Sequence, residues 1–172
     1  NQLRNYRNAY HIFGSNGIMV DWSTLWLTKD LNSPLYLGGL GLMFFSFGGM
    51  LSNLFSTKLI NLFSEKVVGC IFVLIGSFLL FISIIIFNLY FILICLFFYG
   101  FLTANFVPLV IRQAVRQSTE NISTTVGNLV TMGLCSMFIA PAIIGFIAET
   151  YSLTHNMYGL CILIFFTAIV FL

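Results

Sequence analysis

Residues 67–87 read VVGCIFVLIGSFLLFISIIIF, a run of 21 residues without a charged side chain. A helix rises 1.5 Å per residue, so roughly 20 apolar residues cross the hydrocarbon core of a bilayer, which is about 30 Å thick. The run therefore predicts a membrane-spanning helix.

The composition of the whole chain agrees with this prediction. Hydrophobic residues make up 59% of the 172 residues and charged residues only 7%, whereas soluble domains carry about 25% charged residues. Five acidic and seven basic side chains cannot cover a water-facing surface of this size, so lipid is the expected solvent. The net charge of +2, without a basic run, gives no indication of nucleic-acid binding.

Similar apolar runs on both sides of residues 67–87 predict the fold class. We expect an all-α, polytopic membrane bundle of about six transmembrane helices. Their predicted ranges are 10–27, 35–55, 67–87, 90–111, 124–148 and 157–172. Residues 1–9 are too polar for a span and are predicted to be a cytoplasmic linker or truncated start, followed by a six-helix membrane domain over 10–172. The chain begins without Met and stops within an apolar run, so we expect a fragment of a longer protein.

The basic residues predict the orientation of this bundle. If the helices alternate in direction, one side of the membrane receives six of the seven basic residues and the other side receives Lys29. The six are Arg4, Arg7, Lys58, Lys66, Arg112 and Arg116. Basic residues collect in cytoplasmic loops, so both ends of the chain are expected in the cytoplasm.

Asp21 is the costliest residue in the first predicted span. An acid near the bilayer centre costs roughly 2.5–3.5 kcal/mol on insertion scales and normally faces protein or water. Gly14, Gly17, Thr24 and Thr28 recur with Asp21 on one helical face. One interpretation is a substrate or proton contact that lines a cavity, and the other is an acid that bonds within the bundle or reaches the interface.

Two other spans carry polar residues of interest. In the fourth, Asn105 could bind a ligand or satisfy backbone groups freed by a kink at Pro108, which has no N–H to donate. Arg112 and Arg116 follow on the same face and are expected to mark the cytoplasmic boundary.

In the fifth span, Asn128 is a candidate cavity residue, because an amide has no simple partner on its own helix. Pro141 predicts a bend or loosened turn near the far end of this span.

The sequence gives no chemistry typical of an enzyme. The four cysteines are isolated within apolar runs, His11 and His155 have no second ligand at metal spacing, and no catalytic triad or phosphate loop can be assembled. We therefore predict no catalytic residues, no metal and no cofactor.

Three short runs carry a resemblance to a known family. Residues 17–27 read GIMVDWSTLWL, residues 104–108 read ANFVP, and residues 140–149 read APAIIGFIAE. They resemble helices seven, ten and eleven of the major facilitator superfamily, within its bacterial inner-membrane YbjJ group. The resemblance implies the C-terminal half of a transporter that moves a small solute by alternating access. It also implies an N-terminal six-helix half as partner, a location in the bacterial inner membrane, and cavity contacts from Asp21, Trp22 and Asn105.

The chain also departs from that family. Asn16 stands where relatives usually carry Glu, which weakens the case for proton coupling. In the loop between the second and third spans, Ser56, Asn61, Leu62 and Ser64 replace the usual glycine and charged residues, leaving Lys58 as the nearest cation for a gate. The alternative hypothesis is therefore a non-transporting membrane module, or the remnant of a split or decayed transporter gene.

Overall fold

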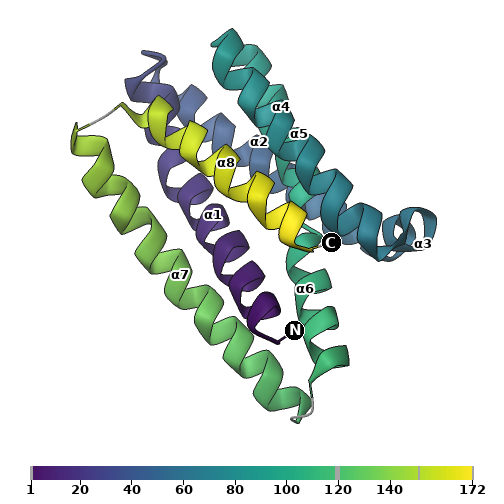
Figure 1. Ribbon diagram of the computed structural model, residues 1–172. Helices are drawn as coiled ribbons and strands as arrows, with labels where there is room; N and C mark the ends of the chain where they lie inside the picture. The colour runs from purple at the N-terminus through teal and green to yellow at the C-terminus, as the bar shows by residue number, and fades with distance from the viewer. Residues whose placement is uncertain (1, 119–120, 151, 172) are drawn as a thin grey trace.

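The computed structural model is built from helices in the residues that it describes, which are 2–118, 121–150 and 152–171, with side chains for 6–118, 121–148 and 152–169. Asn1, Leu172 and the side chain of Arg4 lie outside this part. The elements are α1 (Gln2–Lys29), α2 (Leu35–Leu54), α3 (Ser56–Lys66), η1 (Val67–Ile71), α4 (Phe72–Ile86), α5 (Leu89–Thr103), α6 (Phe106–Gln117), α7 (Ile122–Thr150) and α8 (Leu153–Phe171) (Figure 1).

Four helical stretches are long and apolar enough to cross a membrane. They are Leu35–Leu54, Ser56–Ile86, Leu89–Gln117 and Ile122–Ala148. In α8 the apolar stretch Leu153–Ile169 is shorter, and α1 is long but carries polar residues from Arg7 to Lys29. The helices confirm an all-α bundle suited to a bilayer, whereas the predicted number of six spans is supported for four.

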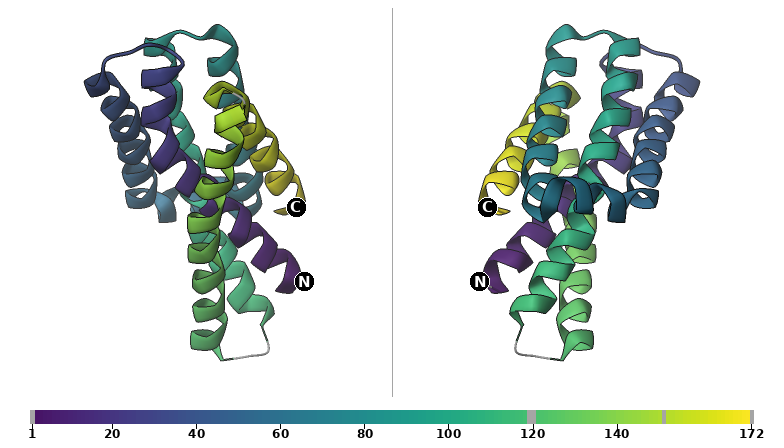
Figure 2. Two further views of the ribbon diagram at one scale, coloured as in Figure 1. Left: turned by 90° about the vertical axis from the view of Figure 1, so that its left-hand side faces the viewer. Right: turned by 90° about the vertical axis from the view of Figure 1, so that its right-hand side faces the viewer.

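In space, the described helices form six rods that run along the bundle: α1, α2, η1 with α4, α5 with α6, α7, and α8. The α1–α2 and α4–α5 connections lie at one end, whereas α6 ends and α7 begins at the other, with the start of α1 towards the same side (Figure 2). We call the end where α6 ends and α7 begins the basic end, since Lys58, Lys66, Arg112 and Arg116 all lie on the segments nearest to it.

The contacts between rods follow an internal repeat. The contact of α1 with α7 has its counterpart in α5 with α2, and these are the two most extensive. Likewise α1–α2 corresponds to α6–α7 and α4–α5 to α8–α1, while α4–α8 and α1–α6 correspond to themselves. The first three rods are therefore related to the last three, and because rods one and four run in opposite directions, the repeat is inverted.

Glycines allow the two extensive contacts. A Cβ atom on Gly48 would lie 2.1 Å from the carbonyl oxygen of Phe97, and one on Gly100 would lie 2.1 Å from that of Phe45. Between α1 and α7, a Cβ on Gly17 would lie 2.9 Å from the oxygen of Met137. Small residues let helix backbones approach closely, which is the usual source of packing energy between helices in lipid.

The structure corrects two sequence predictions. Residues 2–9 are helical rather than a linker: α1 begins at Gln2, and Asn8 and Ala9 are buried, because packing on neighbouring helices outweighs weak local propensity.

The connection after α2 is also helical, as α3, with one irregular residue. Ser64 has φ 67° and ψ 157°, a backbone region that is almost restricted to glycine.

Candidate functional site

Asp21 lies exposed on α1, between the exposed apolar side chains of Val20 and Leu25. Within the described side chains it has no hydrogen-bond or ion-pair partner. Trp26, which contacts α8, lies roughly 140° around the helix axis from Asp21 at 100° per residue, so Asp21 faces away from α8. A carboxylate on such a surface needs water or further protein beside it.

The rest of the polar stripe predicted around Asp21 is used in packing. Gly14 and Gly17 lie against α7, where added Cβ atoms would meet Ala140 and Met137. Thr24 Oγ1 donates to the carbonyl of Gly38 on α2 at 3.3 Å, and Thr28 Oγ1 donates to that of Thr24 at 2.9 Å. Asp21 is therefore the member of the stripe that is left free to meet a ligand or partner.

Trp22 points to a different place from Asp21. Its ring packs against α7, where a Cβ on Gly145 would lie 3.1 Å from Trp22 Cζ2. With Lys29 and Asp30 it lines a cavity of about 410 Å³ near the end opposite the basic end. The indole Nε1 is buried and has no hydrogen-bond partner among the described residues.

Asp30 links the end of α1 to the start of α8 by hydrogen bonds. Its Oδ2 accepts hydrogen bonds from Thr154 N at 2.7 Å and from Thr154 Oγ1 at 2.5 Å. Trp26 Nε1 donates to the same hydroxyl at 3.1 Å. Thr154 lies in the first turn of α8, where backbone N–H groups lack helical partners and a negative charge is favoured. Asp30 therefore acts as a cap on α8 supplied from the end of α1.

Asn105 is fully buried at the break between α5 and α6. Its Nδ2 donates to Ser52 Oγ on α2 at 2.8 Å, while its Oδ1 has no partner among the described residues. Pro108 has no N–H for the carbonyl of Ala104, which accounts for a break at this level. Asn105 therefore links α2 to the break between α5 and α6, and its Oδ1 is not used in this contact. Pro108 itself is exposed.

Arg112 and Arg116 share one carboxylate at the basic end. Arg112 Nη1 lies 3.1 Å from Glu65 Oε1, and Arg116 Nη1 lies 2.9 Å from Glu65 Oε2. The pairs join α6 to α3, and the arginine side chains are 51% and 57% exposed. Glu65 directly follows Ser64, whose strained backbone therefore helps to set the direction of the Glu65 side chain.

Lys58, the cation predicted for the gate, is outside this cluster. It is exposed, and its Nζ lies 5.8 Å from the ring centroid of Phe55.

Asn128 and Pro141 both lie on α7 but differ in burial. Asn128 is exposed, near the start of α7 at the basic end, whereas Asp21 lies in the other half of the bundle. Pro141 is buried, and α7 continues through it without an interruption from Ile122 to Thr150. Hence the break predicted by proline chemistry is present before Pro108 and absent at Pro141.

Taken together, the predicted cavity residues do not meet in one cavity formed by the described residues. Asp21 and Asn128 are exposed at different heights, Trp22 lines the cavity at one end, and Asn105 is enclosed beside Ser52. Sequence reasoning missed Glu65, Asp30 and Thr154. The sequence offers only a weak indication of these contacts. Asp30 stands next to the end of a helix, and Glu65 meets its two arginines only in the folded chain.

The comparisons with known proteins add no identification. A search against protein-family models and a search of curated proteins found no match to this chain.

Proposed function

We propose that this chain is the C-terminal half of a secondary transporter of the major facilitator type, moving a small solute across a bacterial inner membrane. The observation that carries the proposal is the inverted repeat of three rods in the helix contacts. Inverted three-helix repeats make up each half of such transporters, and the half carries one side of a central solute route.

The exposed Asp21 supports the same proposal. Its carboxylate lies on an apolar helix surface without a partner among the described side chains, and acids in such positions usually mark a substrate or ion route. In an intact transporter, the N-terminal six-helix half would cover this surface and leave water beside Asp21. Asn128, which is exposed on α7 nearer the basic end, would lie closer to the cytoplasm, with both ends of this segment on the cytoplasmic side.

The cluster of Glu65, Arg112 and Arg116 fits a gate in this proposal. It links α3 to α6 at the basic end through exposed ion pairs, which cost little to separate. Separation of these pairs would let α6 move relative to α3 while the Asp30 cap holds the opposite end.

Uptake by cells that express the intact protein tests the proposal. A panel of radiolabelled sugars and amino acids is compared in cells with and without the protein, and then with Asp21→Asn. We expect Asp21→Asn to reduce uptake at least about tenfold, the scale of a lost interaction of about 1.4 kcal/mol. The matched control is Leu25→Met. Leu25 is exposed on α1 one helical turn after Asp21, and this variant should keep uptake unchanged.

Unaltered uptake by Asp21→Asn would remove this residue from the mechanism. The alternative, a non-transporting membrane module, is favoured if no solute in the panel enters faster in cells that hold the protein. Both variants must reach the membrane in equal amounts for the comparison to count.

A further inference from the structure

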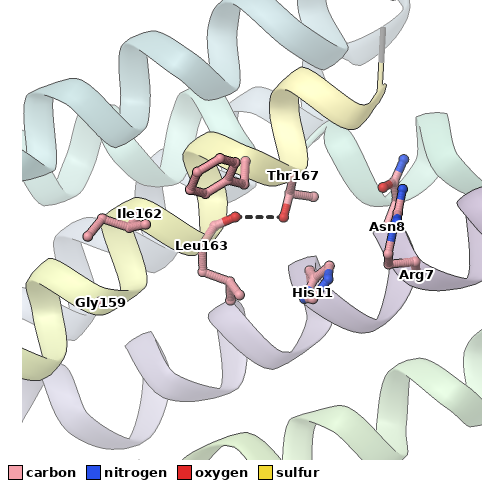
Figure 3. Close-up of a pocket in the computed structure, with 8 residues that line it drawn as sticks. Arg7, Asn8, His11, Gly159, Ile162, Leu163 and Thr167 are labelled. Atoms are coloured by element: carbon pink, nitrogen blue, oxygen red, sulfur yellow. Dashed lines mark hydrogen bonds between the residues drawn. The ribbon is translucent and has the colours of Figure 1, made fainter.

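A second cavity, distinct from the surface around Asp21, lies between α1 and α8. Its volume is about 360 Å³, and it opens to the outside of the bundle. Residues of α1 form one wall and residues of α8 the other (Figure 3). The α1 residues belong to the first turns of that helix, so the cavity lies in the half of the molecule nearer the basic end.

The α1 wall is polar and carries a positive charge. Arg7 and His11 lie one helical turn apart and Asn8 lies beside them, all on the cavity (Figure 3). In the part of the chain with described side chains, Arg7 has no acidic partner, because the two ion pairs found there both involve Glu65. Acidic residues are also missing from the described lining of the cavity.

Asn8 gives an independent indication of a missing ligand. Its side chain is 0% exposed, yet neither Nδ2 nor Oδ1 has a hydrogen-bond partner in the described part of the chain. A buried amide without partners is costly, and nearly all buried polar groups in native proteins are paired. Because Asn8 lines the cavity, a ligand that displaces its side chain from the buried position could accept from Nδ2 and donate to Oδ1.

The α8 wall is mainly apolar, with Thr167 beside the apolar residues, and it continues into a second groove. Ile162 and Phe166 line the cavity and are 54% and 61% exposed. The same two residues line an apolar groove of about 290 Å³ between α8 and α4, together with Phe78 and Phe81. The surface thus passes from a cationic pocket on α1, across α8, to an apolar groove suited to a hydrocarbon chain.

We propose that an anionic phospholipid binds here, with its phosphate headgroup between Arg7, Asn8 and His11 and an acyl chain over Ile162 and Phe166. Basic pockets between membrane helices on the cytoplasmic side are typical sites for anionic headgroups. The lipid supplies both parts of the required chemistry: phosphate and hydroxyl oxygens for the polar wall, and hydrocarbon for the apolar wall. The site is separate from the proposed solute route, because Asp21 faces away from α8.

Thermal unfolding of the intact protein in a neutral detergent tests the proposal. The additions compared are phosphatidylglycerol, phosphatidylcholine with the same acyl chains, and inorganic phosphate. We expect phosphatidylglycerol alone to raise the unfolding temperature substantially. In Arg7→Gln its apparent affinity should fall roughly fivefold, since one cation near an anionic lipid contributes about 1 kcal/mol. The matched control is Lys66→Gln, an exposed cation outside the cavity, which should leave the affinity unchanged.

A second variant protects the test against a folding defect. Asn8→Leu keeps the shape of the side chain but removes its polar atoms, so it should unfold at an equal or higher temperature without lipid and respond less to phosphatidylglycerol. Equal responses of wild type, Arg7→Gln and Asn8→Leu would overturn the site. Equal stabilisation by phosphatidylcholine would overturn the charge recognition, and equal stabilisation by phosphate would assign the pocket to a free anion. If no addition changes the unfolding temperature, the proposal that a lipid occupies the cavity is wrong, and another segment of the protein becomes the expected occupant.

Discussion

The two ends of the bundle each use one carboxylate to join helices that are distant in sequence, but they use it differently. At the end opposite the basic end, Asp30 accepts two hydrogen bonds from Thr154 in partly buried surroundings and caps α8. At the basic end, Glu65 meets Arg112 and Arg116 in ion pairs that are more than half exposed on the arginine side.

This difference has a physical consequence. Hydrogen bonds from a partly buried helix terminus to a carboxylate are short-range and less screened, whereas exposed ion pairs are weakened by water and salt. The contacts of Asp30 should therefore cost more to separate than those of Glu65.

Removal of the Asp30 carboxylate should have the largest effect on stability. Asp30→Ala leaves Thr154 N–H and the start of α8 without their acceptor, and hydrogen bonds to charged groups contribute about 1.5–3 kcal/mol each. We expect the free energy of unfolding to fall by roughly 2–3 kcal/mol, measured by denaturant titration of the purified protein in detergent. The control is Asp21→Ala, which removes an exposed acid of α1 that has no partner among the described side chains, and it should change stability by less than about 0.5 kcal/mol. Equal losses in both variants would contradict the capping role.

Removal of the charge at Glu65 should have a smaller, salt-dependent effect. Glu65→Gln is expected to lower the free energy of unfolding by less than about 1 kcal/mol in dilute buffer, and by almost nothing in about 1 M salt, where the Debye length is near 3 Å. The loss in Asp30→Ala should be the same at both salt concentrations. The same titration measures both variants. A large loss in Glu65→Gln that persists in high salt would remove the contrast between the two ends.

Local sequence pattern was sufficient for the long helices without charged residues, but not for the polar helical segments. The predicted span 35–55 agrees with α2 to within one residue, because a long, mainly apolar run without a charged side chain is stable in lipid as a helix. Residues 2–9 and the segment 58–66 were missed as helices, since polar sequences become helical when tertiary packing supports them.

The partners of the polar groups depend on topology instead. Asp30 and Thr154 are 124 residues apart, and Asn105 and Ser52 are 53 apart. No periodicity in a short window encodes such a contact. Asp21 could be singled out from sequence because its cost depends only on its own charge and the apolar residues around it.

The most direct test of the proposed solute route is the reaction of a thiol at position 21 with a water-soluble maleimide in intact membranes. Asp21→Cys and Phe78→Cys are each placed in a variant whose four natural cysteines are replaced by alanine. Phe78 is 60% exposed on α4 and serves as a control for a lipid-facing position. A thiol must ionise in water to react, so a water-filled route predicts labelling at position 21 at least about tenfold faster than at position 78. Equally slow labelling at both positions would place Asp21 against lipid or dry protein and would contradict the route.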